Sequence, residues 1–272
     1  MKLYRRNRYA VSGWVIISLF FLGVLLYPIK TIALTGKEIM EKQKELQQTK
    51  DEKEVIKMRL IDKKGRIKDR EIVRYSMETE SKLNKIMMVF TKPRDIKGTG
   101  ELTWEQTERD DDQWLFLPAL RKEKRISSSG KKNRFMGTDF AFEDLRPEDL
   151  TAHQYKLIGN EKIDGKDCFL IEAFPSTKKE KKESGYSKRR LWVRKDIFFT
   201  IKKEYYDRKG KIRKIEEARN PESITGSVWR SSDITMQDLK KKHKTILVIK
   251  SRAANTGLKE SFFTLRKLKS LK

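Results

Sequence analysis

The chain has very few of the residues that cross-link a fold or bind a transition metal. Its 272 residues include one cysteine, Cys168, and two histidines, His153 and His243. A single cysteine excludes a disulfide framework within the chain, so stability must come from a buried core. Cys168 stands in an alternating apolar segment, which is more typical of a buried strand residue than of a reactive thiol. Two histidines 90 positions apart supply too few ligands for a zinc site.

Motifs of catalysis and of nucleotide binding are missing as well. Ser127–Ser129 lack the Gly-x-Ser-x-Gly elbow of hydrolases, and Gly98–Gly100 are not followed by a helix start or a Lys-Ser pair. The acidic triplet Asp110–Asp112 can hold a cation such as calcium, although a run of this kind before a strand is usually a solvated loop. We therefore expect a protein that is not an enzyme, with no catalytic residues, no cofactor and no metal.

Long apolar runs are scarce, and the one that stands out is Val11–Leu26, which follows Arg5, Arg6 and Arg8. A basic segment before 16 mostly apolar residues is typical of an export signal, and a full membrane span needs about 20. Small residues at the end of this region predict cleavage near Ala33. Residues 1–33 are thus predicted to be a signal peptide, read by the general secretory route, and an uncleaved anchor is the alternative.

Acidic residues are scarce relative to basic ones. The chain has 39 Asp and Glu against 64 Lys and Arg, for a net charge of +25. Residues 1–33 hold five basic and no acidic residues, which leaves about +20 (59 minus 39) on residues 34–272. The polyanions outside the cytoplasm are phospholipid headgroups, lipopolysaccharide and the surfaces of envelope proteins. An anionic membrane surface is therefore a predicted partner, nucleic acid is not, and solubility alone is the alternative explanation.

A period of two dominates the chain after residue 50. Thr35 is expected to cap a helix over Gly36–Gln48, and about eleven short strands joined mostly by hairpin turns follow, including a terminal segment, Phe262–Leu268. Phe135–Leu150 break the period and are predicted to form short helical turns over the sheet, whereas Ser176–Ser187 are predicted to be a long basic loop. No repeat occurs. These patterns predict a large antiparallel sheet curled into a barrel or half-barrel.

Aromatic and methionine residues stand out against this polar background. On a curled sheet, side chains of the concave face either fill the interior or leave a cavity for an apolar guest. Both interpretations stay open for each aromatic residue. The candidates for lining such a cavity, or for a lid over it, are Trp104, Trp114, Phe116, Phe135, Met136, Phe140, Phe142, Leu145 and Trp192.

Several short motifs follow one another in a set order along residues 34–272. The most specific is Phe-Met-Gly-Thr-Asp-Phe at Phe135–Phe140, and others lie at Phe90–Gly98, Trp114–Pro118, Gly159–Cys168 and Tyr205–Asp207. In order and spacing they resemble the bacterial outer-membrane lipoprotein-sorting protein family, part of the LolA-like superfamily. The resemblance covers nearly all of the chain after the predicted signal peptide.

The resemblance implies a mainly β fold, with one large antiparallel sheet curled into an unclosed β-barrel and a few helices covering its apolar concave side. Residues 34–272 are expected to form a single LolA-like half-barrel domain. The implied activity is that of a periplasmic carrier that shields the acyl chains of a lipid or lipoprotein during transfer towards the outer membrane. An inner-membrane transporter and an outer-membrane acceptor are the implied partners. Lipid is better supported than lipoprotein as cargo, because length and motifs differ from those of the long-known lipoprotein carriers.

A lid mechanism follows from this interpretation. Phe135–Leu145 are predicted to close over the empty cavity and to move aside when acyl chains enter. Asp139 and Asp144 are predicted to anchor this lid to nearby Lys or Arg side chains. An envelope sensor or regulatory adaptor that uses the same fold without transporting cargo is the alternative function. The identity of the cargo stays open.

Overall fold

The computed structural model describes Met1 and residues 33–271. The predicted signal peptide lies almost entirely outside the described residues, so its cleavage and the single domain after it stay predictions. Among the described residues, no helix has the length and apolar character needed to cross a membrane.

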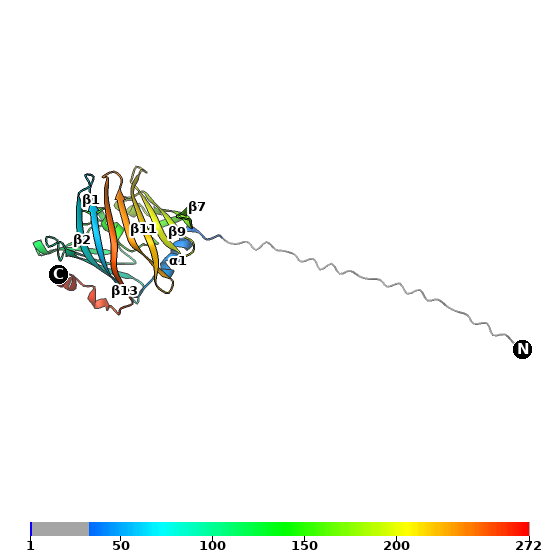
Figure 1. The fold of residues 1–272 in the computed structure, drawn as a ribbon, viewed down its shortest axis with the longest axis horizontal. Helices are drawn as coiled ribbons and strands as arrows, with labels where there is room; N and C mark the ends of the chain where they lie inside the picture. The colour runs from blue at the N-terminus through cyan, green and yellow to red at the C-terminus, as the bar shows by residue number, and fades with distance from the viewer. Residues whose placement is uncertain (2–32, 272) are drawn as a thin grey trace. The chain divides into compact units, whose positions relative to one another are not determined.

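Within residues 33–271, thirteen strands form one antiparallel sheet (Figure 1). The strands are β1 (Asp51–Ile61), β2 (Ile67–Glu78), β3 (Asn84–Lys92), β4 (Gly100–Trp104), β5 (Asp112–Leu117), β6 (Lys122–Arg125), β7 (His153–Ile163), β8 (Lys166–Pro175), β9 (Lys188–Arg194), β10 (Phe199–Tyr206), β11 (Ile212–Thr225), β12 (Val228–Asp238) and β13 (His243–Ala254). Their order is β6-β5-β4-β3-β2-β1-β13-β12-β11-β10-β9-β8-β7. The sheet does not close, because β6 and β7 form its two edges. The predicted mainly β, unclosed half-barrel is confirmed.

Three α-helices and four short 3-10 helices accompany the sheet in the described chain. They are α1 (Gly36–Leu46), α2 (Lys178–Glu183), α3 (Leu265–Ser270), η1 (Pro118–Leu120), η2 (Ser128–Gly130), η3 (Phe142–Leu145) and η4 (Glu260–Phe262). The predicted start of α1 is confirmed: Thr35 and Glu38 form a reciprocal capping box, with Glu38 N donating to Thr35 Oγ1 over 3.2 Å.

Two predictions about local structure were wrong. The segment expected to be a terminal strand, Phe262–Leu268, ends η4 and begins α3, because the Thr264 hydroxyl accepts a hydrogen bond from Lys267 N and starts a helix. The basic segment expected to be a loop, Ser176–Ser187, contains α2. Its cap is formed in the same way, by Thr177 and the backbone of Glu180.

Alternation along β3 defines two faces of the sheet. Ile86, Met88 and Phe90 pack with the connection between β6 and β7, on the face called the inner face here. Met87 and Val89 point the other way and pack against α3, on the outer face. The inner face therefore carries the long connection between the two edge strands, while the outer face carries the C-terminal segment.

Helix α1 also covers the inner face. Ile39 and Met40 are fully or almost fully buried against Ile171 of β8 and Leu191 of β9. A Cβ on Gly36 would lie 2.8 Å from the β7 backbone, so only glycine permits this close approach of the helix start to the sheet. Together, α1 and the β6–β7 connection bound the space on the inner face.

Candidate functional site

The β6–β7 connection is here called the cover segment over residues 131–150. It contains a tight hairpin whose turn residues, Met136 and Gly137, have φ values of 44° and 76°, as in a type I′ turn. Phe135 N donates to Phe140 O over 2.8 Å and closes the hairpin. The most specific sequence motif thus encodes a turn that brings the backbones of Phe135 and Phe140 together.

The apolar side chains of the cover segment fill much of the inner face. Phe135 is 1% exposed, and its ring stacks on that of Phe90 with centroids 5.6 Å apart. Phe142 meets Phe135 edge-on at the same distance, while Phe140 packs in a neighbouring cluster with Tyr205. Met136 and Leu145 complete the contacts. The structure thus brings five of the nine predicted cavity or lid residues to the inner face.

Asp139 fastens the hairpin to β13. Its fully buried carboxylate accepts hydrogen bonds from Arg134 Nη2 at 2.9 Å and from the Thr245 hydroxyl at 2.7 Å, and His243 Nδ1 lies 2.6 Å from it. The hydroxyl of Thr245 also accepts from the backbone N–H of Asp139 over 3.0 Å. A carboxylate with this many donors resists displacement from the sheet.

Asp144 makes the corresponding attachment to β11. Lys214 Nζ lies 3.0 Å from its carboxylate, the Tyr186 hydroxyl donates over 2.9 Å, and Ala141 N donates over 2.7 Å. The Asp144 and Lys214 side chains are 2% and 8% exposed. Burial, and next the charge of Asp144, raise the pKa of Tyr186 well above its ordinary value, which keeps the phenol a donor.

Glu148 and Arg189 secure the far end of the cover segment to β9. The guanidinium donates two hydrogen bonds to the carboxylate, at 2.8 and 2.6 Å, and Tyr155 of β7 donates a third. Burial alone would raise the pKa of Glu148, but the charge and hydrogen bonds of Arg189 outweigh it and hold the pKa at about 2. Burial, followed by the charge of Arg189, lowers the pKa of His153 to about 4, so this imidazole is neutral at pH 7.

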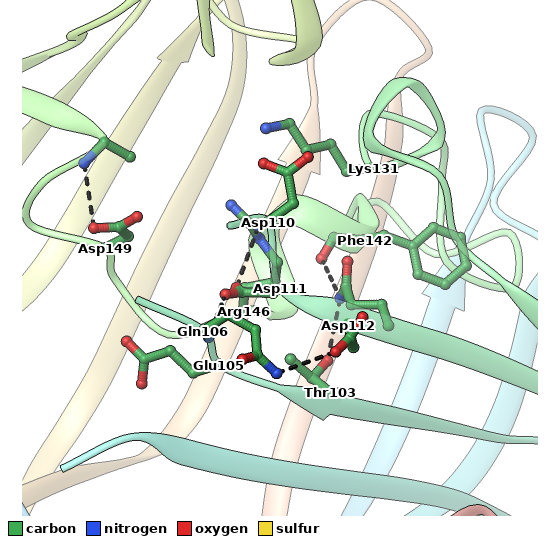
Figure 2. A network of polar contacts seen from close by, with 12 residues as sticks. Thr103, Glu105, Gln106, Asp110, Asp111, Asp112, Lys131, Phe142, Arg146 and Asp149 are labelled. Atoms are coloured by element: carbon green, nitrogen blue, oxygen red, sulfur yellow. Dashed lines mark hydrogen bonds and ion pairs between the residues drawn. The ribbon is translucent and has the colours of Figure 1, made fainter. Parts of the chain in front are cut away.

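Two further contacts attach the middle of the cover segment to the β4–β5 region, which Figure 2 shows from close by. Arg146 Nη1 lies 3.2 Å from Asp111 Oδ2. The side-chain amide of Gln113 donates to the Phe142 carbonyl over 3.1 Å. The cover segment is thus held to strands in both halves of the sheet by several buried polar contacts.

A cavity of about 440 Å³ lies on the inner face between α1, the sheet and the cover segment. Its apolar lining comes from residues such as Met40, Leu145 and Leu191, and its polar lining includes Arg74 and Arg230. Ligand cavities typically measure about 300–1,000 Å³. The size fits a ligand, whereas the lining is mixed and not uniformly apolar, so an amphiphile with a polar group suits this space better than bare hydrocarbon.

Four of the predicted cavity residues lie elsewhere. Trp104, Trp114 and Phe116 point to the outer face, where they pack with α3 and the preceding residues, and Trp104 Nε1 donates to Phe263 O over 2.9 Å. Trp192 also lies on the outer face and donates to Glu161 over 2.7 Å. These four aromatic residues contribute to the outer core, and a role in holding cargo from that face remains only a sequence prediction.

The acidic triplet has partners that explain it without a cation ligand. Asp110 pairs with Lys179 at 2.8 Å, Asp111 with Arg146, and Asp112 accepts from Arg109 at 2.8 Å. Among the residues that the structure describes, no group of three or more His, Cys, Asp or Glu is placed to hold a metal ion. The triplet thus lies among cations, close to the cover segment.

Sequence reasoning missed the groups on the sheet that hold the cover segment. Gln113, Arg189, Lys214 and Thr245 belong to four strands and carry no distinguishing local pattern. Only two of the anchoring residues could be predicted from the sequence: Asp139, which lies inside the motif Phe135–Phe140, and Asp144, which follows it. The partners of a carboxylate more than 60 positions away become visible only when register is known.

Glu101 of β4 is a further buried charge on the inner face. The hydroxyl of Thr103 and the amide of Gln113 donate to Oε1, while Oε2 has no hydrogen-bond partner in the described part of the chain. Burial raises the pKa of Glu101 to about 7 despite these donors. The folded state therefore binds this proton more tightly than the unfolded chain, whose value is 4.5. Stability from this group is fully present below pH 4.5 and is lost as the pH rises to about 7.

Replacing Glu101 by Gln is expected to raise the free energy of unfolding by up to about 3 kcal/mol at pH ~8, with little change near pH 5. Chemical denaturation at both pH values measures the difference. Glu54→Gln is the matched control. Burial raises the pKa of Glu54, but Arg74 and Arg252 outweigh it and lower the pKa, so this substitution should destabilise the protein at pH ~8. A pH-independent effect of Glu101→Gln would contradict the raised pKa.

Comparison with known proteins places this arrangement in a family. A family profile described as "Uncharacterized protein" matches residues 82–270. A crystal structure of a Vibrio parahaemolyticus domain assigned to outer-membrane lipoprotein sorting is 33% identical, with a TM-score of 0.81, covering 86% of this chain and 98% of that domain. The chain belongs to the outer-membrane lipoprotein-sorting protein family. No protein in the curated set matches the sequence.

Two other solved structures have the same fold as this chain. A DUF1329 family protein from Desulfovibrio piger is 28% identical, with a TM-score of 0.80 over 86% of this chain and 97% of that one. A LolA superfamily protein from Nitrosomonas europaea is 22% identical, with a TM-score of 0.65 over 85% of this chain and 98% of that one, and so shares the fold. The resemblance seen in the motifs is confirmed.

Proposed function

We propose that this protein is a periplasmic carrier that shields the acyl chains of a lipid or lipoprotein during transfer towards the outer membrane. Family membership supports the general role. The observation that carries the proposal is the inner face itself, where a cavity of about 440 Å³ adjoins a separate segment that is packed on the sheet through phenylalanine side chains. No catalytic step is part of this proposal.

The cover segment acts as the lid of this carrier. In the empty protein, Phe135, Phe140 and Phe142 occupy the apolar part of the inner face. When acyl chains enter, these rings move aside and the chains take their place on the sheet. Asp139 and Asp144 anchor the closed position through the contacts with β13 and β11 described above.

The energies favour a ligand with more than one acyl chain. Exposing three buried phenylalanines costs roughly 6 kcal/mol, and breaking the buried polar contacts adds several more. An acyl chain of about 15 methylenes supplies roughly 12 kcal/mol when it is fully buried. One chain therefore little more than offsets opening, whereas two or three chains leave a clear surplus.

The mixed lining of the cavity adds a requirement for a polar group on the cargo. Arg74, Lys203 and Arg230 line it together with acidic side chains such as Glu52 and Glu216. A phospholipid-like headgroup or the peptide end of an acylated lipoprotein can exchange hydrogen bonds with these groups, whereas hydrocarbon cannot. Loading from an inner-membrane transporter and release to an outer-membrane acceptor complete the proposed route, at an anionic membrane surface.

Native mass spectrometry with organic extraction, on protein purified from a bacterial periplasm, tests the carrier function. We expect bound lipid or acylated peptide in stoichiometric amount, and its identity names the cargo. The matched measurement is the melting temperature of delipidated protein with and without added lipid. A bare chain that neither binds added lipid nor changes its melting temperature would refute the carrier function and favour an adaptor that uses the same fold.

A further inference from the structure

The two ends of the sheet differ strongly in charge. Antiparallel pairing brings alternate turns to the same end of the sheet. The pairs that show this are Ile61 with Lys244, Lys214 with Asp238 and Tyr206 with Lys188. The hairpin end, as we define it, consists of the connections at residues 62–66, 93–99, 118–121, 207–211 and 239–242. The opposite end consists of residues 79–83, 164–165, 195–198 and 226–227. The connections at residues 105–111 and 176–187 meet, with Lys179 Nζ 2.8 Å from Asp110 Oδ1, and belong to neither end.

The hairpin end is basic and the opposite end is nearly neutral. Connections of the hairpin end hold twelve Lys and Arg against three Asp and Glu, a net charge of +9. Those of the opposite end hold two against three, a net charge of −1. Lys240, Lys241 and Lys242 are exposed and form no ion pair with any residue that the structure describes. The connections at the hairpin end therefore carry much more positive charge than those at the opposite end.

Exposed aliphatic side chains gather at the same end. Within residues 34–271, six large hydrophobic side chains are exposed, and four of them lie at or beside the hairpin end. These are Ile67 (54% exposed), Leu120 (62%), Ile212 (40%) and Leu239 (37%). Each is directly next to a Lys or Arg in the sequence. Turns β1–β2 and β12–β13, which carry Ile67 and Leu239, lie side by side along the upper edge in Figure 1.

We infer that the hairpin end docks on the surface of an anionic lipid bilayer. Lys and Arg bind anionic headgroups, and aliphatic side chains between them insert at the boundary between headgroups and acyl chains. Both kinds of side chain are spread over separate turns along a rim, and the hollow between the β1–β2 and β12–β13 turns is lined by polar and charged side chains and not by apolar ones. This distribution suits a broad fluid surface better than the shaped patch of an acidic protein partner.

Docking in this way fixes the orientation of the cavity. Its lining includes Gln47, Thr49, Glu78 and Asn84, which lie at or near the opposite end. The cavity therefore lies away from the bilayer and stays accessible to a transporter or acceptor that projects from the membrane. This inference adds a docking surface to the carrier function proposed above. Binding to the bilayer is measured without cargo. A failure of membrane docking therefore leaves the carrier function standing, and a failure of the carrier function leaves membrane docking standing.

Flotation of the purified protein with vesicles tests the inference. We expect binding to vesicles that contain phosphatidylglycerol and not to phosphatidylcholine alone, with a steep loss as salt increases. Each Lys held at an anionic surface strengthens binding roughly fivefold. The variant Lys240→Glu/Lys241→Glu/Lys242→Glu is therefore expected to bind at least about tenfold more weakly.

A matched control separates the hairpin end from net charge. Lys82→Glu/Lys162→Glu/Lys166→Glu makes the same change in charge at exposed positions at or beside the opposite end, and we expect it to retain binding within about threefold. Equal losses in both variants would show that overall charge and not the hairpin end binds the membrane, which would overturn the inference. Absence of binding to anionic vesicles would overturn it too, in favour of an acidic protein partner.

A fluorescent probe tests insertion of the aliphatic tips. Cys168 is completely buried, so a polarity-sensitive thiol label on native protein reports an introduced cysteine. Leu120→Cys, at the hairpin end, should shift its emission to the blue with anionic vesicles. Ser227→Cys, in the exposed β11–β12 turn, should not. The same shift at both positions, or at neither, contradicts the proposed orientation.

Discussion

Replacing Arg189 by methionine is expected to lower the free energy of unfolding by about 3 kcal/mol at pH ~7. The substitution leaves the Glu148 carboxylate, which is 25% exposed, without the guanidinium that donates two hydrogen bonds to it. Truncating one member of a largely buried ion pair destabilises through the charge that remains, more than through the lost attraction. Denaturation curves of the wild-type and variant proteins measure the difference.

The pH dependence of the two proteins should have opposite sign. In the wild-type protein the pKa of Glu148 is about 2, below its unfolded value of 4.5. Its contribution is therefore present above pH 4.5 and is lost as the pH falls towards 2. Without Arg189, burial raises this pKa, so the variant should regain stability as the pH falls and Glu148 becomes protonated.

A double substitution provides the control for this ion pair. Glu148→Gln/Arg189→Met removes the stranded charge and should be more stable than Arg189→Met alone at pH ~7, by about 1–2 kcal/mol. Hydrogen exchange of residues 146–150 should speed up in Arg189→Met, because this end of the cover segment loses its attachment to β9. If the double variant is as unstable as the single one, packing of the arginine stem and not charge explains the loss.

Most of the fold was predictable because it rests on local patterns. The alternation in β2 and the turn at Lys63–Gly65 specify a hairpin without any distant contact, and in the structure Ile61 pairs with Ile67 across this turn. Thr35 likewise starts α1 through a contact only three positions away. In contrast, Phe262–Leu268 alternate weakly and are helical only because Thr264 caps α3 and Leu268 reaches a buried place against β4.

The site was less predictable because face assignment depends on register. Trp114 and Leu115 are neighbours in β5, yet the first lies on the outer face and the second on the inner face. Aromatic content alone cannot distinguish them, since both faces of this sheet are covered. The segment Phe135–Leu150 was recognisable as a break in the alternation, but the short helical turns predicted over all of it occur only at Phe142–Leu145, and Phe135–Phe140 form a hairpin around Gly137 instead.

The largest functional effect is expected for Phe135→Ala. Phe135 is 1% exposed, and its removal should lower the free energy of unfolding by about 3–5 kcal/mol while leaving an apolar space on the inner face beneath the cover segment. A cavity lined only by apolar side chains stays dry and accepts an apolar guest. Because the ring no longer competes with an acyl chain, a fluorescent fatty acid should bind about tenfold or more tightly than to the wild-type protein.

Phe263→Ala is the matched control for Phe135→Ala. Phe263 is fully buried but lies on the outer face beside α3, so its removal should cost similar stability without improving acyl binding. Phe135→Leu, a smaller change, keeps the measurement possible if the alanine variant does not fold, and it should show a weaker gain in affinity. The decisive comparison is between faces. Equal affinity in the Phe135 and Phe263 variants would mean that acyl chains do not occupy the space beneath the cover segment, whereas a gain confined to Phe135 places the cargo there.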